Sequence, residues 1–375
     1  MKEMNVGVLG ATGAVGQEML KILAERNFPV KSLRPLASAR SAGKTILYKG
    51  EPVPIAEAKE DAFKGLDLVL GAAENDIAMR FAPHILDAGA VFVDNSSAFR
   101  LKEDAFKGLD LVLGAAENDI AMRFAPHILD AGAVFVDNSS AFRLKEDVPL
   151  IVPEINPEDA KWHKGIIANP NCTTIVTLVA VAPLAKASPI ETMVASSYQA
   201  VSGAGVAGMR ELAEEIEAEF KGEAYEPRAF AHPIAYNVIP QIGSEQYLGY
   251  TSEEMKMQNE GRKILHLPQM LVSCTCVRVP VVRSHSVSVV LRTKEKISVD
   301  RARALIAAAP GCKLVDDLKN HVYPMPLDTS DQDLVYVGRI REDLTSDRGL
   351  NLWCCGDQIR KGAATNAVQI AELLL

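Results

Sequence analysis

The sequence predicts an α/β protein with two domains, and three observations support that fold class. The chain has 375 residues, which exceeds the usual size of a single hydrophobic core. A short apolar strand at the N-terminus is followed at once by a glycine-rich turn and a helix. Further along, apolar segments with strand character alternate with segments of helical periodicity, as in parallel sheets covered by helices.

The composition is that of an ordinary globular protein and excludes several classes of function. Hydrophobic residues make up 48% and charged residues 23% of the chain. The net charge is −8 without a basic block, which argues against nucleic acid as the main partner. No apolar run reaches membrane-spanning length, so no membrane is expected. The first residues run straight into a strand, so no signal peptide is expected.

The cysteines indicate a reducing compartment. There are six of them, spread thinly over a long chain, which favours the cytoplasm over a disulfide-stabilised secreted protein. The pairs in Cys274-Thr275-Cys276 and Cys354-Cys355 lack zinc-ligand spacing and have no matching histidine pair. We therefore expect those four to be structural, and we expect no metal.

The N-terminal turn predicts a dinucleotide-binding domain of the Rossmann type. Gly10, Gly13 and Gly16 form a G-x-x-G-x-x-G pattern between a strand at 5–9 and a helix at 17–26. The first glycine permits the tight turn, and the later ones let the backbone approach a pyrophosphate at the helix N-terminus. A plain glycine turn could have the same spacing, but the strand before it and the helix after it favour the nucleotide.

The loop after the next strand, residues 30–36, bears on the choice of cofactor. An NAD-binding domain usually carries an acid here for the ribose hydroxyls. This chain has Ser38, Arg40, Ser41 and Lys44 instead, and an arginine suits the 2′-phosphate of NADP. On residue types alone, a solvated polar loop is an equally good interpretation.

Residues 59–101 are repeated without change as residues 102–144. Each copy reads strand, helix, strand. Only two copies exist, and they match even at positions that are free to vary, so a recent duplication or an error of sequence assembly is favoured over a solenoid. Two identical units cannot occupy one position in a sheet. We hypothesise that the second copy supplies its loop 137–143 to the active site, and that the first copy forms an extra edge unit or a disordered bulge.

A candidate nucleophile follows the repeat. Cys172 lies between an apolar run at 165–167, which reads as a strand, and another at 175–180, which reads as a buried helix. It is therefore expected at a helix N-terminus, where unpaired N–H groups and the helix dipole favour a thiolate. An isolated cysteine is more often a small buried hydrophobe, so the sequence around Cys172 decides between the two interpretations.

Two further segments offer polar side chains for a small substrate. Gln199 follows a predicted strand at 190–197 and can orient a polar group, although such a residue is more often on the surface. Glu260 and Lys263 share one face of a predicted helix, where an ordinary surface ion pair is the simpler interpretation. The acidic face of the helix at 206–220 is expected to be solvated.

Arg278 and His285 lie in an extended segment at 276–286. On a regular strand they point to opposite faces, so they converge only if the segment bends, for example at Pro280. A lone histidine in a sheet is more often a structural residue with satisfied hydrogen bonds.

Five motifs occur in a fixed order along the chain: GATGAVG at 10–16, DNSSAFR at 137–143, NPNCTT at 169–174, YQAVSGAG at 198–205 and RVPVVRSHS at 278–286. Together they resemble the motifs of the bacterial aspartate-β-semialdehyde dehydrogenase family. The resemblance runs nearly end to end, and the duplicated segment is its main departure from the family pattern.

The resemblance implies a role for each candidate residue. Cys172 resembles the nucleophile that forms an acyl-thioester, His285 the general acid/base, and Gln199 the residue that orients the reacting end of the substrate. Arg278 would bind the α-carboxylate and Glu260 the α-ammonium. The residues implied for inorganic phosphate are Lys263, Asn171 and the loop arginine, Arg143 or Arg100. The residues implied for NADP are Gly10, Thr12, Gly13, Ala14, Val15, Gly16, Ser38, Arg40, Ser41, Ser202, Gly203 and Asn366.

The resemblance also implies an architecture. Residues 1–168 would form the NADP-binding domain, completed by a C-terminal helix within 355–375. Residues 169–354 would form an α+β catalytic and dimerisation domain, in a homodimer without nucleic-acid or membrane partners.

The reaction implied is the reversible, NADP-dependent conversion of L-aspartyl-4-phosphate to L-aspartate 4-semialdehyde and inorganic phosphate, in the biosynthesis of lysine, threonine, methionine and diaminopimelate. One alternative is a related enzyme such as N-acetyl-glutamyl-phosphate reductase, against which Glu260 argues because it suits a free ammonium. The other is a non-catalytic NADP-binding regulator.

Overall fold

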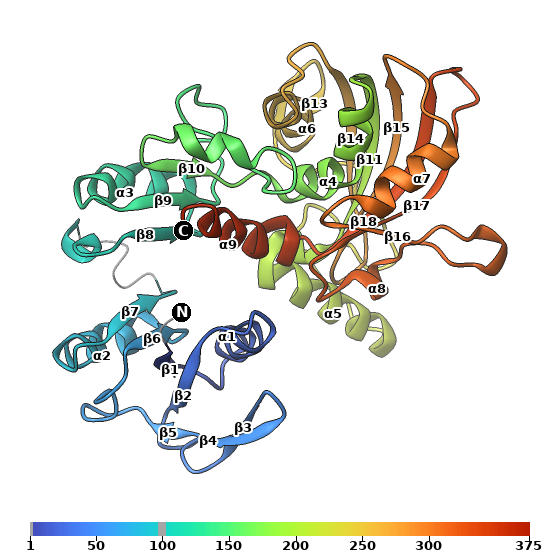
Figure 1. Ribbon diagram of the computed structural model, residues 1–375. Helices are drawn as coiled ribbons and strands as arrows, with labels where there is room; N and C mark the ends of the chain where they lie inside the picture. The colour runs from blue at the N-terminus through green and yellow to red at the C-terminus, as the bar shows by residue number, and fades with distance from the viewer. Residues whose placement is uncertain (1–2, 97–102) are drawn as a thin grey trace. The chain divides into compact units, whose positions relative to one another are not determined.

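The computed structural model describes residues 3–96 and 103–375, and the chain forms two compact units, Met1–Ala105 and Phe106–Leu375 (Figure 1). The division between the units falls just inside the second copy of the repeat. The first copy therefore belongs to the first unit, and nearly all of the second copy belongs to the second.

The first unit is built on a five-stranded parallel sheet. Its strands, in spatial order, are β5 (Ala56–Glu57), β2 (Val30–Ala37), β1 (Met4–Leu9), β6 (Leu68–Gly71) and β7 (Val91–Asp94). A hairpin of β3 (Thr45–Tyr48) and β4 (Glu51–Pro54) lies outside this sheet.

Helices cover both faces of that sheet, because alternate residues of β1 point to opposite sides. Val6 and Val8 pack in one cluster with Leu20 of α1 (Ala14–Glu25). Leu9 packs in another cluster with Phe81 of α2 (Asn75–Asp87). A parallel sheet covered on both faces is the doubly wound arrangement that the sequence predicts.

The second unit contains a three-stranded parallel sheet in the order β10 (Ile166–Ala168), β9 (Val134–Asp137), β8 (Leu111–Gly114). Phe135 of β9 packs in the cluster that includes Phe124 of α3 (Asn118–Asp130). Its neighbour Val136 packs with Ile370 of α9 (Thr365–Glu372), so α3 and α9 lie on opposite faces. A π-helical turn, Arg360–Ala364, precedes α9 where one continuous helix was expected.

The larger sheet of the second unit is mixed and has six strands. In spatial order they are β14 (Leu271–Arg278), β11 (Ile190–Gln199), β15 (His285–Thr293), β18 (Gly349–Gly356), β17 (Val335–Glu342) and β16 (Cys312–Leu314). The helices α4 (Cys172–Ala187), α6 (Ser252–Ile264) and α7 (Val299–Ala308) pack against it (Figure 1). Because α4 contacts the sheet as well as both other helices, every residue from 173 to 181 is buried.

The remaining elements are short or peripheral, except α5 (Gly205–Lys221). They are β12 (Glu245–Tyr247), β13 (Tyr250–Thr251), α8 (Pro326–Thr329) and 3-10 turns at Glu103–Phe106, Pro157–Trp162, Val201–Ala204 and Leu318–Asn320. Within the described residues, the helices are all too short or too polar to cross a membrane.

The two copies of the repeat lie in different sheets. The first copy supplies β6, which pairs with β1, and β7, which pairs with β6. The second copy supplies β8 and β9, and β9 pairs with β10. The expectation that the first copy is an extra edge unit or a disordered bulge is therefore wrong for its described residues, because it provides the strand beside β1 in the first sheet.

Candidate active site

Cys172 is the first residue of α4, and three residues separate it from β10. Asn171 caps the helix: its Oδ1 accepts hydrogen bonds from the backbone N–H groups of Thr173 (3.0 Å) and Thr174 (3.1 Å). Cys172 itself is half-buried. Its predicted position at a helix N-terminus is confirmed.

The expected depression of the thiol pKa is wrong. Burial, and then the nearby carboxylate of Glu253, raise the pKa of Cys172 to about 11, although Thr173, Arg143 and Lys256 act in the opposite direction. Dehydration and a like charge disfavour the thiolate more than these groups favour it. At neutral pH the free protein therefore holds the sulfur as a thiol.

Three predicted site residues meet at one edge of the six-stranded sheet. Gln199 ends β11 and is in register with Arg278, which ends the parallel strand β14. His285 begins the antiparallel strand β15 on the other side of β11. The segment 276–286 is thus not one bent strand as expected, because the chain leaves the sheet after Arg278, crosses the end of β11 and re-enters at His285. Arg278 and His285 nevertheless lie close together, because Gly203 packs against both side chains.

His285 is fully buried, and one of its ring nitrogens is unsatisfied. Its Nδ1 accepts a hydrogen bond from the backbone N–H of Ala200 (3.0 Å), whereas its Nε2 is buried without a hydrogen-bond partner among the described residues. Burial, and then the charge of Arg278, lower the pKa of His285 to about 3. The ring is therefore neutral at physiological pH, with its proton on Nε2, where it can donate a hydrogen bond to a bound ligand.

Ala200, whose N–H binds His285, also binds Arg278. Its Nη1 donates to the carbonyl oxygen of Ala200 (2.7 Å), so Arg278 and His285 bind the two backbone polar groups of Ala200. Gly203, which the family resemblance assigns to the cofactor, packs against both side chains: a Cβ there would lie 2.6 Å from Nη1 of Arg278 and 3.2 Å from Cε1 of His285. A side chain at this position would therefore displace the guanidinium of Arg278.

Glu253 of α6 is a site residue that the sequence analysis missed. Its Oε1 accepts hydrogen bonds from the amides of Asn171 (2.9 Å) and Gln199 (3.4 Å), and its Oε2 accepts one from Lys256 (2.9 Å). Burial would raise the pKa of Glu253, but Lys256, Asn171 and His285 outweigh it and lower the pKa below its usual value. Glu253 is therefore a carboxylate beside the thiol. Glu253 and Lys256 have the same Glu-x-x-Lys spacing as the predicted pair seven residues later, and that spacing could have indicated them.

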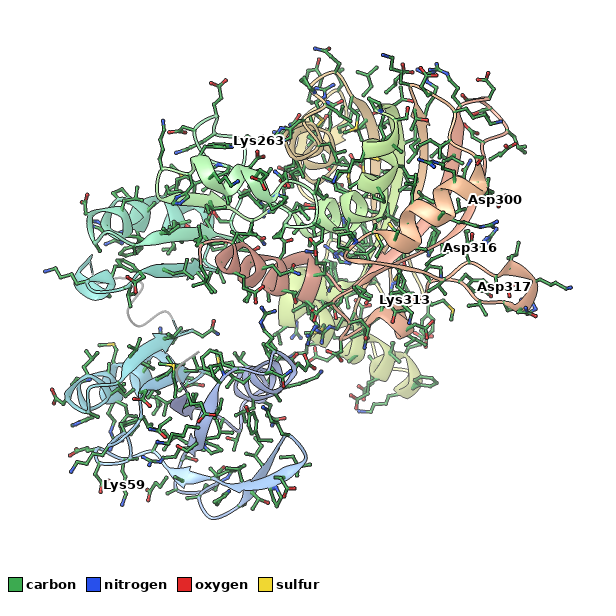
Figure 2. All side chains as sticks on the ribbon, in the orientation of Figure 1. Lys59, Lys263, Asp300, Lys313, Asp316 and Asp317 are labelled. Atoms are coloured by element: carbon green, nitrogen blue, oxygen red, sulfur yellow. The ribbon has the colours of Figure 1, made fainter. Side chains whose placement is uncertain are left out.

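The pair that the sequence predicts, Glu260 and Lys263, forms a supporting frame instead. Glu260 is buried, and its two oxygens accept from Nη1 of Arg143 (3.1 Å) and from the backbone N–H of Asn171 (2.7 Å). Lys263, which is labelled in Figure 2, donates to the backbone carbonyls of residues 143, 145 and 148 at 2.6–2.9 Å. Its three N–H donors are thus all used by the segment that follows β9.

Arg143 reaches this frame from the second copy of the repeat. Its Nη2 donates to the carbonyl oxygen of Asn138 (2.8 Å), and its Nε is buried without a hydrogen-bond partner in the described part of the chain. The guanidinium also favours the thiolate of Cys172 electrostatically. Arg100, its counterpart in the first copy, lies outside the described residues.

Two other residues that the resemblance assigns to NADP, Asn366 and Ser202, form hydrogen bonds within the second unit. The amide of Asn366 is fully buried and bonds to Ile151 O (3.0 Å), Asn169 Oδ1 (2.6 Å) and Lys361 Nζ (2.8 Å). Ser202 is buried, and its hydroxyl accepts from Gln358. The bonds of Asn366 tie the start of α9 to the residues that precede Cys172.

The first unit brings the predicted dinucleotide-binding residues together. Gly10 has φ of +81°, and a Cβ there would lie 2.7 Å from the carbonyl oxygen of Ala72. A Cβ on Gly16 would overlap the carbonyl oxygen of Gly10, so both positions require glycine. The loop with Ser38 and Arg40 follows β2, the parallel neighbour of β1, and therefore lies at the same carboxyl edge of the sheet.

The remaining predicted cofactor residues belong to this same edge. They are Thr12, Gly13, Ala14 and Val15 in the turn and first helical residues after β1, and Ser41 in the loop after β2. The glycine cradle at the N-terminus of α1 suits a dinucleotide pyrophosphate. In the part of the chain that the structure describes, His, Cys, Asp and Glu side chains form no group suited to a metal ion.

Comparison with known proteins identifies the class to which this fold belongs. Residues 5–110 and 101–163 match the NAD binding domain of semialdehyde dehydrogenases, and residues 181–361 match their dimerisation domain. The chain is thus built as a semialdehyde dehydrogenase, with a thiol at the start of a helix in its second unit.

Individual relatives narrow the class. Aspartate-semialdehyde dehydrogenase of Synechocystis is 46% identical over 99% of this chain and 97% of its own length, and that of Campylobacter jejuni is 43% identical over 99% and 97%. The crystal structure of aspartate semialdehyde dehydrogenase II from Vibrio cholerae has a TM-score of 0.72 at 38% identity and covers 100% of this chain and 98% of that one. The same enzyme complexed with ASA has a TM-score of 0.73. The chain belongs to the aspartate-semialdehyde dehydrogenase family, as its five motifs predict.

Proposed function

We propose that this chain catalyses the reversible, NADP-dependent conversion of L-aspartyl-4-phosphate to L-aspartate 4-semialdehyde and inorganic phosphate through an acyl-thioester on Cys172. The pathway would be the biosynthesis of lysine, threonine, methionine and diaminopimelate. The observation that carries the proposal is the set of groups around the thiol, namely the Glu253 carboxylate and the guanidinium groups of Arg143 and Arg278, together with the unsatisfied Nε2–H of His285, which lies beside Glu253 and Arg278.

The substrate carries a carboxylate and an ammonium, and the site offers one group for each. Arg278 suits the α-carboxylate, because Ala200 uses only its Nη1 and the rest of its planar fork can bind a carboxylate bidentately. We assign the α-ammonium to Glu253 because its carboxylate acts directly on the Cys172 sulfur, whereas Glu260 forms a buried ion pair with Arg143. Gln199, which touches Glu253, would orient the reacting end of the substrate.

The phosphate requires cations near the thiol. We assign it to Arg143 and Lys256, with Asn171 beside them, because Lys263 has no donor left for it. Lys256 is part-exposed and forms an ion pair with Glu253, and the Nε of Arg143 is unsatisfied among the described residues. Both cations favour the thiolate of Cys172, so both would also act on a phosphate that leaves the acyl carbon attacked by this sulfur.

In the reductive direction, the Cys172 sulfur attacks the acyl carbon, the C–O bond to phosphate breaks, and the thiol proton leaves with the phosphate. Bound NADPH supplies the hydride that reduces the resulting thioester. As the tetrahedral carbon forms, its oxygen becomes an anion, which the Nε2–H of His285 can stabilise by donating a hydrogen bond. Collapse of that species releases the aldehyde and the sulfur anion, which takes a proton from water.

The bond from Ala200 refines the role of His285. The family resemblance implies a general acid/base, but a neutral ring whose Nδ1 accepts from a backbone N–H already carries its proton on Nε2. We propose that His285 acts first as a hydrogen-bond donor to the substrate oxygen in both directions. If His285 acted as a base, its ring would become a cation, and burial and the charge of Arg278 both disfavour that cation.

The remaining assignments rest on the first unit, the six-stranded sheet and the cysteines. We propose NADP over NAD because Arg40, rather than an acid, follows β2.

We propose a homodimer through the six-stranded sheet, where Val194, Tyr198 and Leu271 are exposed apolar side chains on the neighbouring strands β11 and β14. A cytoplasmic location fits six free thiols.

Two alternatives are not favoured. An N-acetyl-glutamyl-phosphate reductase acts on a substrate without a free ammonium, and such a substrate offers no positive charge to the Glu253 carboxylate. The curated relatives are aspartate-semialdehyde dehydrogenases over nearly their full length. A non-catalytic NADP-binding regulator leaves the organised surroundings of Cys172 without a purpose.

The test is phosphate-dependent reduction of NADP with aspartate semialdehyde, followed by absorbance of the reduced cofactor. Cys172→Ala should abolish the reaction, while Cys312→Ala, which changes another half-buried free cysteine, should retain it. Activity in the Cys172→Ala variant, or activity without phosphate in the wild type, contradicts the proposal.

A further inference from the structure

Two acids on α5 are buried, although the sequence predicts a solvated acidic face. Glu211 and Glu215 are 3% and 5% exposed. Both bind the segment 228–235, which follows the helix. The two oxygens of Glu211 accept from the backbone N–H groups of Arg228 (2.7 Å), Ala229 (2.5 Å) and Phe230 (3.1 Å). Glu215 accepts from those of Ile234 (2.8 Å) and Ala235 (2.6 Å).

The segment held by Glu211 carries the ring that lies against Arg278. The guanidinium carbon of Arg278 is 5.7 Å from the centroid of Phe230, within cation–π range. The ring also packs toward α5, because a Cβ on Gly208 would lie 3.0 Å from its Cζ. Phe230 is thus fixed at its backbone by Glu211 and at its ring by α5 and Arg278.

Arg278 depends on that support. Its Nη1 bonds to the carbonyl oxygen of Ala200, and within the described residues it forms no ion pair. The aromatic ring, on which the guanidinium lies, therefore helps to fix its plane. Arg278 and Phe230 also line a cavity of about 300 Å³, together with Ala204, His232, Ile239 and Gln241.

We propose that Glu211 is a positioning residue for recognition of the substrate carboxylate. Its carboxylate locks residues 228–230, these hold the Phe230 ring against Arg278, and the ring keeps the guanidinium in the plane that a carboxylate binds bidentately. The inference rests on the proposed function, because it takes Arg278 as the carboxylate anchor. Glu211 itself touches neither the substrate nor the reacting atoms.

Glu211→Gln tests the proposal with little change in size. The amide has one acceptor oxygen, and its NH2 group faces backbone donors, so residues 228–230 lose part of their support. We expect KM for aspartate semialdehyde to rise about tenfold, because a misplaced binding group weakens binding steeply. The kcat and the KM values for phosphate and NADP should stay within about twofold. Glu219→Gln, an exposed acid on the same helix, is the matched control and should leave all constants unchanged.

A double-mutant cycle separates positioning from general loosening. In an Arg278→Lys background, which removes the planar fork, Glu211→Gln should raise KM no further. Glu211→Asp should restore part of the wild-type KM, because it keeps a carboxylate. Additive effects in the cycle, or a fall in kcat without a rise in KM, overturn the proposal.

Alkylation of Cys172 gives a readout that does not depend on turnover. Iodoacetate carries a carboxylate that Arg278 can bind, whereas iodoacetamide does not. Glu211→Gln should lower the ratio of the two alkylation rates and leave the iodoacetamide rate unchanged, and an unchanged ratio overturns the proposal. Should the wild type lack phosphate-dependent activity, the proposed function fails, while this ratio still decides the role of Glu211. If Glu211→Gln does not fold, Phe230→Leu tests the same support and should give the same change.

Discussion

The two copies of the repeat share one sequence but differ in their surroundings. Each copy forms strand, helix, strand, and the helices α2 and α3 both span thirteen corresponding residues. Burial differs. Val69 in the first strand of the first copy is fully buried, while its counterpart Val112 is half-buried. In the last strand the order reverses: Val93 is 50% exposed, and its counterpart Val136 is 1% exposed.

The difference follows from the neighbours that each copy meets. In the first copy β6 lies between β1 and β7, and β7 is the last strand of its sheet. In the second copy β9 lies between β8 and β10, and β8 is the last strand. The sequence of the repeat therefore determines its helices and strands, whereas the chain on either side determines which strand is central. Asp137, which ends the central strand β9, is fully buried, whereas its counterpart Asp94 is only half-buried.

The largest expected effect concerns the loop arginines. Arg143→Lys should lower kcat/KM for aspartate semialdehyde by about 100-fold or more, because lysine cannot replace a planar fork bound to Glu260 and Asn138. Arg100→Lys should leave kcat/KM close to the wild-type value. Steady-state kinetics check both variants, and a loss confined to Arg100→Lys would mean that the first copy serves the site.

The second largest effect is a loss of stability when a valine in the last strand of each copy is replaced by alanine. Val136→Ala should lower the free energy of unfolding by about 2 kcal/mol, because it leaves a cavity between β9 and α9. Val93→Ala should change it by less than about 0.5 kcal/mol, as is usual for an exposed site. Urea denaturation followed by circular dichroism measures both. Equal losses would show that β7 is also covered in solution.

In the first strand of each copy we expect the larger loss of stability in the first copy, and a smaller difference between the two copies than in the last strand. Val69→Ala should destabilise the first unit by about 2 kcal/mol, and Val112→Ala should cost about half as much because its side chain is only half-buried. Since the two units can unfold separately, proteolysis of each unit during the urea titration assigns the loss to one of them. A larger loss for Val112→Ala would place the second copy beside β1.

The smallest expected effect is on the reactivity of Cys172. The pKa of about 11 predicts that the iodoacetamide rate rises steadily with pH through about pH 9 and 10 without a plateau. Arg143 favours the thiolate, so Arg143→Ala should raise the thiol pKa and slow alkylation at about pH 9 by about threefold. Arg100→Ala should leave the pH profile unchanged. A plateau near neutral pH would contradict the raised pKa.

Much of the fold could be predicted from the sequence, because the responsible signals are local. The strand, glycine turn and helix at the N-terminus and the start of α4 at Cys172 are confirmed. The local pattern left open whether Arg278 and His285 converge, and the structure brings them to one end of the sheet by a crossing over the end of β11 rather than by a bend within one strand.

What could not be predicted depends on tertiary surroundings. Two Glu-x-x-Lys pairs lie seven residues apart on α6, and only packing shows that Glu253 faces the thiol while Glu260 faces Arg143. The raised pKa of Cys172 comes from burial and from a carboxylate 81 residues further along the chain, which outweigh the helix end. Glu211 and Glu215 look like surface residues until the backbone donors of 228–235 are brought against them.

The strands β7 and β8 each end a sheet, and both keep one side free of strand partners in the described chain. Val91, Val93 and Leu113 are exposed along them. A free edge strand is a template for a strand from another molecule. A lysine at position 93 or 113 should therefore lower any association of dimers at high protein concentration, as measured by light scattering.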